Sequence, residues 1–244
     1  MKTLGIIPSR YASTRFPGKP LIDINGKTMI QCVYEQAKKA SSLSQVIVAT
    51  DDKRIFEHVN SFGGNVIMTA NSHESGTDRC AEVLKKIDEK FDVVINIQGD
   101  EPFINPEQIN QLSVCFEDDK TDIATLIKKI NTKEELFNPN RPKVEIDENG
   151  FAKMFSRNAI PKLPNTEKKD WLATHNFYKH IGIYGYRSNI LKKISQLPQS
   201  PLEIEERLEQ LRWLENNCAI KVAITEYEAI AIDTPEDLKK ITFK

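Results

Sequence analysis

Three cations crowd one short loop near the start of the chain. Arg10, Arg15 and Lys19 follow the apolar run Leu4-Gly5-Ile6-Ile7, which has the composition of a strand and ends at Pro8. The loop is rich in Ser, Thr, Pro and Gly, which argues against a helix. In α/β sheets, ligands bind beyond the carboxyl ends of the strands. Positive charges there predict an anionic ligand, most simply the triphosphate of a nucleotide; the alternative is a solvated basic loop with no ligand.

A second candidate site follows an apolar strand in the middle of the chain. The run Val93-Val94-Ile95-Asn96-Ile97 leads directly into Gln98-Gly99-Asp100-Glu101-Pro102. Asp100 is therefore expected at the carboxyl edge of the sheet, beside a glycine that permits close approach. A carboxylate there can hold Mg²⁺, which favours one or two carboxylates together with waters and substrate phosphates. On the residues alone, a turn aspartate that caps backbone N–H groups explains Asp100 equally well.

Two further motifs have simpler structural interpretations. Asp233 precedes Thr234-Pro235 and a run of acidic residues, a pattern typical of a helix start. Asn25-Gly26-Lys27-Thr28 looks like the end of a phosphate-binding P-loop, but that motif needs a glycine where this chain has Leu21. We therefore expect a hairpin turn at this Asn-Gly pair.

The polar residues of the second half are also ambiguous on their own. His180 and Tyr184 are spaced to point to the same face of a strand, where packing alone accounts for them. Arg157 fits a surface ion pair, and Glu209 can bridge to Arg212 at i,i+3 on a helix. None of these residues indicates a function without further evidence.

Composition restricts the class of protein. The chain has 244 residues, with 34 Lys and Arg against 35 Asp and Glu, so its near-neutral charge gives no indication of nucleic acid or anionic membrane as a partner. No apolar run approaches the ~18 residues of a membrane span, and an expected strand begins too early for a signal peptide. The cysteines are far apart, which favours reduced thiols in the cytoplasm. Signatures of dinucleotide binding, zinc proteolysis and serine hydrolysis are absent from the sequence.

The order of elements predicts the fold class. Val- and Ile-rich runs alternate with amphipathic stretches in the first half, which is typical of right-handed βαβ units and a mostly parallel sheet covered on both faces. Strands are expected over residues 4–8, 45–50, 65–69 and 92–97, and helices over 29–40, 53–62, 77–90 and 106–116.

The pattern changes at about residue 122. A long strand is expected over 122–130, a hairpin over 143–146 and 151–155 around an Asn-Gly turn, a strand over 179–187 that returns to the main sheet, and a helix over 201–217. The proline- and lysine-containing stretch 161–170 is expected to be a mobile excursion, and the sequence leaves open whether residues 161–176 form a lid. We therefore predict one domain, residues 1–244, with a small subdomain inserted at about 122–186.

Residues 6–21 resemble the nucleotide-binding loop of the sugar nucleotidyltransferases, in the variant found in the 3-deoxy-manno-octulosonate (Kdo) cytidylyltransferases. The likeness continues in order along essentially the whole chain. It is carried by Ser75-Gly76-Thr77, Gln98-Gly99-Asp100-Glu101-Pro102, Phe155-Ser156-Arg157, His180-Ile181-Gly182-Ile183-Tyr184-Gly185-Tyr186, Pro201-Leu202-Glu203, Leu208-Glu209-Gln210-Leu211-Arg212 and Asp233-Thr234-Pro235-Glu236-Asp237-Leu238.

The resemblance implies a Rossmann-like, glycosyltransferase-A-like α/β fold and transfer of CMP from CTP to Kdo. Pyrophosphate would be released, and the product would feed lipopolysaccharide synthesis. The anomeric hydroxyl of Kdo would attack the α-phosphorus in line, in a reaction that depends on positioning and charge neutralisation more than on covalent help. The family likeness also implies Mg²⁺ as cofactor and a homodimer formed through the inserted subdomain.

The resemblance also implies a role for each matching residue. Catalysis would depend on Lys19, Asp100, Asp233 and Arg10, with Asp100 and Asp233 as the metal ligands. The nucleotide would contact Pro8, Ser9, Arg10, Arg15, Lys19, Ser75, Gly76 and Gln98. The sugar pocket would comprise Arg79, Gln98, Arg157, His180, Tyr184, Glu209 and Gln210, with an arginine suited to the Kdo carboxylate because its planar fork makes two charge-assisted bonds.

The chain departs from the family pattern in a few places. Ser9 stands where alanine is more usual, Asp78 replaces a more usual glutamate, residues 225–232 lack the usual glycines, and residues 161–176 match poorly. Alternatives that the sequence leaves open are a related acidic sugar, either an 8-amino Kdo analogue or sialic acid, and a catalytically idle nucleotide-binding protein. A glycosyltransferase would need an Asp-x-Asp after the central strand, which Gln98-Gly99-Asp100 does not supply.

Overall fold

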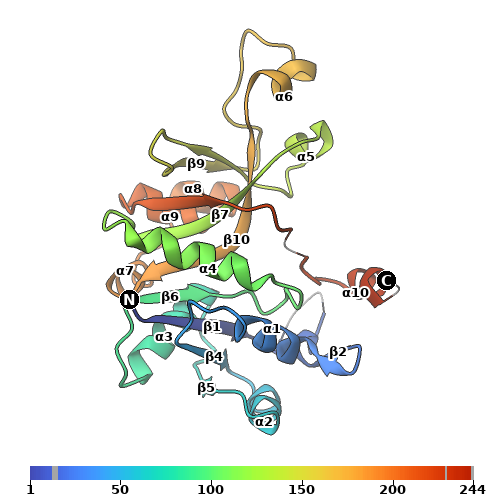
Figure 1. Cartoon of the computed structure of the whole chain (residues 1–244), viewed down its shortest axis with the longest axis vertical. Helices are drawn as coiled ribbons and strands as arrows, with labels where there is room; N and C mark the ends of the chain where they lie inside the picture. The colour runs from blue at the N-terminus through green and yellow to red at the C-terminus, as the bar shows by residue number, and fades with distance from the viewer. Residues whose placement is uncertain (13–15, 229, 243–244) are drawn as a thin grey trace.

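The central feature of the computed structural model is a twisted, mostly parallel sheet; the structure describes residues 1–12, 16–228 and 230–242. Its strands run in the order β11-β7-β10-β6-β1-β4-β5 (Figure 1). Within the described chain, β10 alone in this row is antiparallel to its neighbours. The predicted sheet is confirmed. The strand bounds are β1 Thr3–Ser9, β4 Gln45–Thr50, β5 Val66–Met68, β6 Val93–Asn96, β7 Ile123–Lys129, β10 Tyr178–Arg187 and β11 Ile220–Ile224.

Helices cover both faces of this sheet, which is why its strands are apolar on both sides. One core lies between the sheet and α1, α2 and α4; the other lies between the sheet and α3, α7 and α9. In β6, Val93 and Ile95 belong to the first core and Val94 to the second, as expected from alternation along a strand. The bounds are α1 Met29–Ala37, α2 Lys53–Ser61, α3 Gly76–Lys86, α4 Pro106–Val114, α7 Ser188–Ile194, α8 Pro201–Glu206, α9 Gln210–Glu215 and α10 Pro235–Thr242.

A small hairpin and a 3-10 turn lie between β1 and α1. The Asn25-Gly26 pair forms the turn of a small hairpin, β2 Asp23–Ile24 with β3 Lys27–Thr28, and both turn residues have positive φ. The hairpin prediction is confirmed, and no phosphate loop is formed by these residues. The 3-10 turn Lys19–Leu21 precedes the hairpin.

The single helix expected over residues 201–217 is wrong. The chain instead forms α8 and α9, separated at Arg207, whose φ of 54° lies in the left-handed region. A residue in this conformation ends a helix because the next residues cannot continue its hydrogen bonds. The break turns the chain so that Leu208 and Leu211 pack into the core beside α3 and α7. The apolar spacing in the sequence continues across this break, so the spacing alone predicted one helix where there are two.

An insertion leaves the main sheet between β7 and β10. It contains β8 Lys143–Ile146, β9 Ala152–Ser156, α5 Lys133–Phe137, the 3-10 turn Lys168–Asp170 and α6 Trp171–Thr174. It projects from the body in Figure 1 and has a small core of its own, formed by Ile130, Leu136, Trp171 and Phe177. The expected range of 122–186 also includes β7 and the second half of β10, which pair in the main sheet. Residues 130–177 leave the seven-strand row, but β8 stays hydrogen-bonded to the start of β10 and β9 to β8, so this hairpin extends the same sheet.

The register of the parallel strands brings their carboxyl ends to one edge. Ser9, at the end of β1, is aligned with Thr50, at the end of β4, and the chain after β6 passes beside Pro8. A Cβ on Gly99 would lie 2.7 Å from the carbonyl oxygen of Pro8, so this approach requires a glycine. The loops that follow β1 and β6 are therefore held against each other.

Candidate active site

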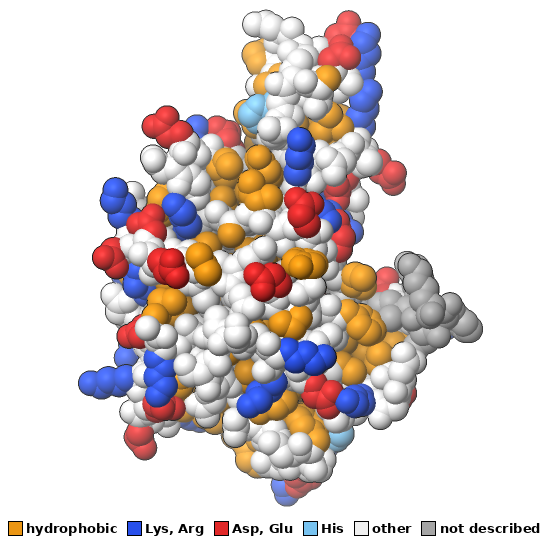
Figure 2. Space-filling model, viewed as in Figure 1, with side chains coloured by type: hydrophobic (Ala, Val, Ile, Leu, Met, Phe, Trp, Pro, Cys, Tyr) orange, Lys and Arg blue, Asp and Glu red, His pale blue; other side chains and the backbone are white. Residues whose placement is uncertain are grey.

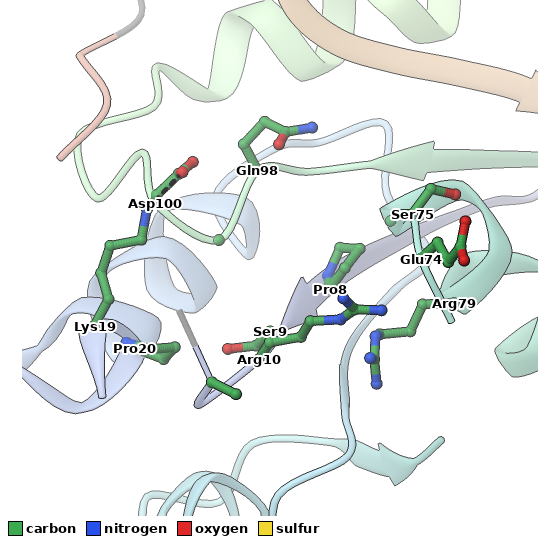
Figure 3. A pocket seen from close by; sticks show the side chains of 13 residues that line it. Pro8, Ser9, Arg10, Lys19, Pro20, Glu74, Ser75, Arg79, Gln98 and Asp100 are labelled. Carbon is green, nitrogen blue, oxygen red and sulfur yellow. Dashed lines mark hydrogen bonds and ion pairs between the residues drawn. The ribbon is translucent and has the colours of Figure 1, made fainter. Parts of the chain in front are cut away.

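A cavity of about 400 Å³ opens at this edge of the sheet. Figure 3 shows its side chains: Lys19 and Asp100 face each other at one end, and Arg10, Arg79 and Ser75 lie toward the other. The lining comes from the loops after β1 and β6 and from the start of α3. It comprises Pro8, Ser9, Arg10, Ala12, Lys19, Pro20, Glu74, Ser75, Gly76, Arg79, Gln98, Gly99 and Asp100.

Every residue that the resemblance assigned to the nucleotide lies in this cavity, with one exception. Arg15 lies outside the described residues. The Ser75 hydroxyl caps α3 by accepting a hydrogen bond from the Asp78 amide, so the cavity borders the positive end of that helix. The Arg10 Nη2 and the Ser9 hydroxyl are buried, and the described part of the chain offers neither a hydrogen-bond partner. An anion in the cavity would satisfy the guanidinium.

Lys19 lies between the two predicted metal carboxylates. Its Nζ is 2.8 Å from Asp100 Oδ2 and 3.2 Å from Asp233 Oδ1. The segment that carries Asp233 is fixed because the Ile232 amide donates to the Asp100 carbonyl oxygen at 2.9 Å. Residues from the two ends of the sequence thus converge on one cation. The sequence alone did not show that Asp100 and Asp233 lie close together.

The loop after β1 is held at its base by a contact that the sequence did not reveal. The Gly18 amide donates to the Tyr11 carbonyl oxygen at 3.0 Å, and a Cβ on Gly18 would lie 3.2 Å from the Tyr11 ring. The Arg54 guanidinium lies over the Tyr11 ring, with its carbon 3.2 Å from the ring centroid, and both carboxylate oxygens of Asp52 accept hydrogen bonds from the guanidinium. We call this set the Tyr11 clasp. Lys19 follows it directly.

Arg79 lies on the nucleotide side of the cavity. It is wholly buried, with its guanidinium bonded to Asp51 Oδ2 at 2.9 Å and to the Thr69 hydroxyl. Asp51 and Thr69 follow β4 and β5, which lie on the far side of β1 from β10. The structure therefore places Arg79 beside Arg10 and Ser75 and away from His180 and Tyr184, with which the resemblance grouped it.

His180 and Tyr184, two of the other predicted sugar residues, contact each other on β10. His180 Nε2 is 3.0 Å from the Thr125 hydroxyl, and the ring contacts Phe155 and Tyr184. Burial lowers the pKa of His180 far below its usual 6.5, which leaves the ring neutral near pH 7. Burial also raises the pKa of the Tyr184 hydroxyl.

Glu209 connects these residues to the cavity. Its carboxylate accepts from the Thr77 hydroxyl at 3.2 Å, in the first turn of α3, and burial raises its pKa. Glu209 also lines a second cavity of about 330 Å³, which shares Glu74 and Ser75 with the first. Gln210 follows it and is 4% exposed.

Arg157 stands apart from these residues. Its guanidinium donates to the carbonyl oxygens of Glu206, Arg207 and Pro139, at 2.6, 3.2 and 3.2 Å. Two of these carbonyls belong to the end of α8, so Arg157 caps that helix and ties the insertion to it. It lines neither of the two cavities described above. The structure does not bring it together with the other predicted sugar residues.

Sequence reasoning missed Asn96, which is 5% exposed at the end of β6. It also missed Thr77 and the Tyr11 clasp. The signal for Asn96 was present, since an amide interrupts an otherwise apolar run in a strand that is covered on both faces. No comparable signal exists for the Tyr11 clasp, because Tyr11 and Arg54 meet only in the folded chain.

Comparison with known proteins agrees with this site. The sequence model described as "Cytidylyltransferase" matches residues 4–228. A 3-deoxy-manno-octulosonate cytidylyltransferase of Parabacteroides distasonis is 59% identical and one of Cytophaga hutchinsonii 57% identical; each match covers 98% of this chain and 96% of the relative.

Solved structures extend the comparison to the fold. The structure of a CMP:2-keto-3-deoxy-manno-octonic acid synthetase complexed with CTP superposes with a TM-score of 0.92 at 41% identity, and covers 100% of this chain and 98% of that one. A 4-diphosphocytidyl-2C-methyl-D-erythritol synthase of Anaerococcus prevotii shares the fold at a TM-score of 0.63 and 14% identity, covering 99% of this chain and 97% of that one. The cavity, the fold and the full-length matches agree: the chain belongs to the cytidylyltransferase family and groups within it with the 3-deoxy-manno-octulosonate cytidylyltransferases.

Proposed function

We propose that this protein transfers CMP from CTP to Kdo and releases pyrophosphate, a step that would supply CMP-Kdo for lipopolysaccharide synthesis. The observation that carries the reaction type is the position of Lys19 between Asp100 and Asp233, at the mouth of a cavity that also contains Arg10 and Ser75. The choice of CTP and Kdo rests on the relatives, which carry that name at up to 59% identity over nearly the whole chain.

The cavity suits a triphosphate because its cations are fixed before the ligand arrives. Arg10 is partly buried, with its Nη2 fully covered, and Lys19 is anchored by the Tyr11 clasp and the two carboxylates. Charges held in place stabilise a developing negative charge without reorganising, which is the largest contribution to many enzymatic rates. Arg10 and Lys19 would hold the phosphates and offset the charge that grows on the departing pyrophosphate.

Asp100 and Asp233 fit a divalent cation. Their oxygens already converge on one positive charge, the Lys19 ammonium, at 2.8 and 3.2 Å. Two carboxylates match the preference of Mg²⁺, which takes its other ligands from water and phosphate. When bound, Mg²⁺ would neutralise phosphate charge and lower the pKa of a nearby hydroxyl. We therefore propose that these two residues hold Mg²⁺.

We further propose a cytoplasmic homodimer formed through the insertion. Figure 2 shows hydrophobic side chains at the surface of the face that it draws. The large hydrophobic side chains that are exposed include Phe137 at 40%, on α5 of the insertion, Ile224 at 51%, at the end of β11, and Tyr227 at 39%. The described residues contain no helix long and apolar enough to cross a membrane. The four cysteines are unpaired, which suits a reducing compartment. Sedimentation equilibrium tests the dimer, and a monomeric mass at micromolar concentration would refute it.

Pyrophosphate release by the purified protein tests the reaction. CTP, UTP, ATP and GTP are each combined with Kdo, 8-amino Kdo or sialic acid, with and without Mg²⁺. The Lys19→Met variant, purified identically, controls for contaminating enzyme. We expect release that requires CTP, Kdo and Mg²⁺ together. Release with a different sugar acid would keep the mechanism and change the substrate, whereas silence from protein that binds CTP would indicate an idle nucleotide-binding protein.

A further inference from the structure

Asn96 has an unsatisfied carbonyl deep in the protein. It is the last residue of β6 and is 5% exposed, and the described residues provide no hydrogen-bond partner for its Oδ1. Its side chain meets the Tyr186 hydroxyl on the face of the sheet covered by α3. A buried polar atom without a partner costs about 1–3 kcal/mol, so its presence calls for an explanation.

Other unsatisfied groups lie on β10, which pairs with β6, and on α9, which contacts β10 through Trp213. Asn96 is aligned with Tyr184 across the β6–β10 pair, and Tyr184 contacts the Trp213 ring edge-on, with centroids 5.0 Å apart. The Tyr184 hydroxyl, the Trp213 indole N–H and the Gln210 amide nitrogen are all buried and lack a hydrogen-bond partner in the part of the chain that the structure describes. This set offers donors and acceptors but no formal charge. It suits hydroxyl groups rather than phosphate.

Only a thin wall separates Asn96 from the cavity. Gly76, which lines the cavity, has no side chain; a Cβ there would lie 3.3 Å from the Asn96 amide nitrogen and 3.7 Å from its Oδ1. Gln98, two residues further along the same strand end, also lines the cavity. Asn96 thus lies between the nucleotide cavity and the cluster of His180 and Tyr184.

We propose that Asn96 is a specificity-determining residue that reads the sugar: its Oδ1 accepts a hydrogen bond from a hydroxyl of the sugar-acid substrate, beside Tyr184 and Gln210. This rests on the proposed function, because it concerns the sugar half of the same site. A site built to bond a hydroxyl rejects an analogue that lacks it, since the buried acceptor is then left unpaired. Asn96 would therefore contribute to discrimination among sugar acids and not to nucleotide binding.

Steady-state kinetics of Asn96→Leu test this role, with Gln111→Leu as a matched control. Gln111, on α4, carries another buried carbonyl oxygen that lacks a partner among the described residues, but it does not line the cavity, and α4 covers the face of the sheet opposite α3. We expect Asn96→Leu to raise the KM for Kdo at least about 10-fold and to leave the KM for CTP within about 2-fold. Gln111→Leu should leave both unchanged. Equal KM values for Kdo in Asn96→Leu and wild type would overturn the proposal.

A stability measurement separates this role from a structural one. Because Oδ1 is unpaired before substrate binds and the Tyr186 hydroxyl keeps its contact with the Thr77 hydroxyl, replacement of Asn96 by an apolar group of similar size should leave thermal unfolding of the substrate-free protein close to that of wild type. If Asn96→Leu unfolds at markedly lower temperature and its KM for Kdo changes in parallel with kcat, Asn96 is structural and the proposal fails. Asn96→Ser, which retains a shorter acceptor, is used if the leucine variant does not fold.

Deoxy analogues of Kdo identify the hydroxyl. Wild type should use one of the 4-, 5-, 7- and 8-deoxy sugars at least about 10-fold less efficiently than Kdo, and Asn96→Leu should lose that preference. Unchanged discrimination against every analogue in the variant would overturn the role of Asn96 alone. Absence of turnover by wild type with Kdo would instead refute the proposed function, and the assignment of Asn96 to a hydroxyl of that sugar with it.

Discussion

The Ile232 amide donates a 2.9 Å hydrogen bond to the carbonyl oxygen of Asp100. This bond joins the segment after β11 to the loop after β6, and the buried Ile232 side chain packs with Ile24 and Met29 beneath it. Asp233 is consequently delivered to the same ammonium as Asp100. The candidate metal site therefore depends on a backbone contact and an apolar anchor as well as on its two carboxylates.

Ile232→Ala should loosen this anchor. The truncation removes methyl groups from a fully buried side chain, a change that costs about 2–5 kcal/mol in a packed core. Because Ile232 anchors the segment that carries Asp233, we expect the loss to appear as misplacement of Asp233: kcat falls about 10-fold or more and the Mg²⁺ requirement rises. Ile230→Ala, in the same segment but 50% exposed, is the control. Wild-type kcat in Ile232→Ala would show that the anchor is dispensable.

Asp100→Asn should lower turnover strongly and change the stability of the protein little. The amide keeps the shape but loses the charge that pairs with Lys19. If the carboxylate contributes about 3 kcal/mol to transition-state stabilisation through the metal, kcat falls about 100-fold. Turnover is measured at saturating CTP, Kdo and Mg²⁺. Asp118→Asn, whose ion pair with Lys221 lies elsewhere on the surface, should retain activity. Near-normal turnover in Asp100→Asn would contradict the metal assignment.

Arg54→Ala should weaken nucleotide binding from outside the cavity. Without the guanidinium on the Tyr11 ring, the loop that places Lys19 loses one side of its clasp. A cation–π contact at an exposed site is worth about 0.5–1 kcal/mol, so the KM for CTP should rise about 2- to 5-fold with little change in the KM for Kdo. Lys53→Ala, the neighbouring exposed cation on α2, should have no effect. A selective change in the Kdo parameters would contradict this role.

The fold was predictable where local patterns and global packing agree. The apolar runs predicted β4 and β8 to the residue, and Pro106 marked the start of α4, where the structure adds a capping box at Asn105. The break between α8 and α9 was not predictable, since Arg207 carries no left-handed signature of the kind that glycine or asparagine gives. The break depends on the packing of Leu208 in the core, which is a tertiary contact.

The sequence predicted only those parts of the site that residue types and their place after a strand indicate. A cationic loop and a carboxylate after a strand were visible because strand ends meet at one edge. The placement of Arg79 on the nucleotide side, the capping role of Arg157 and the orphaned carbonyl of Asn96 are consequences of long-range contacts. No spacing in the sequence encodes those contacts.

His180 should make stability pH-dependent in acid. Its ring is packed among the uncharged Thr125, Phe155 and Tyr184, and burial holds its pKa well below 6.5. Below pH 6.5 the unfolded chain therefore binds a proton that the folded chain does not, so the unfolding free energy of wild type falls as pH falls. Relative to His180→Gln, the loss of unfolding free energy approaches about 1.4 kcal/mol per pH unit.

Denaturant unfolding at pH 7.5, 6.5 and 5.5 measures this loss, and His175→Gln, which replaces an exposed histidine, is the control. Because both variants remove one histidine, a difference between them isolates the effect of burial. Parallel curves for wild type and His180→Gln would mean that His180 titrates normally in the folded protein.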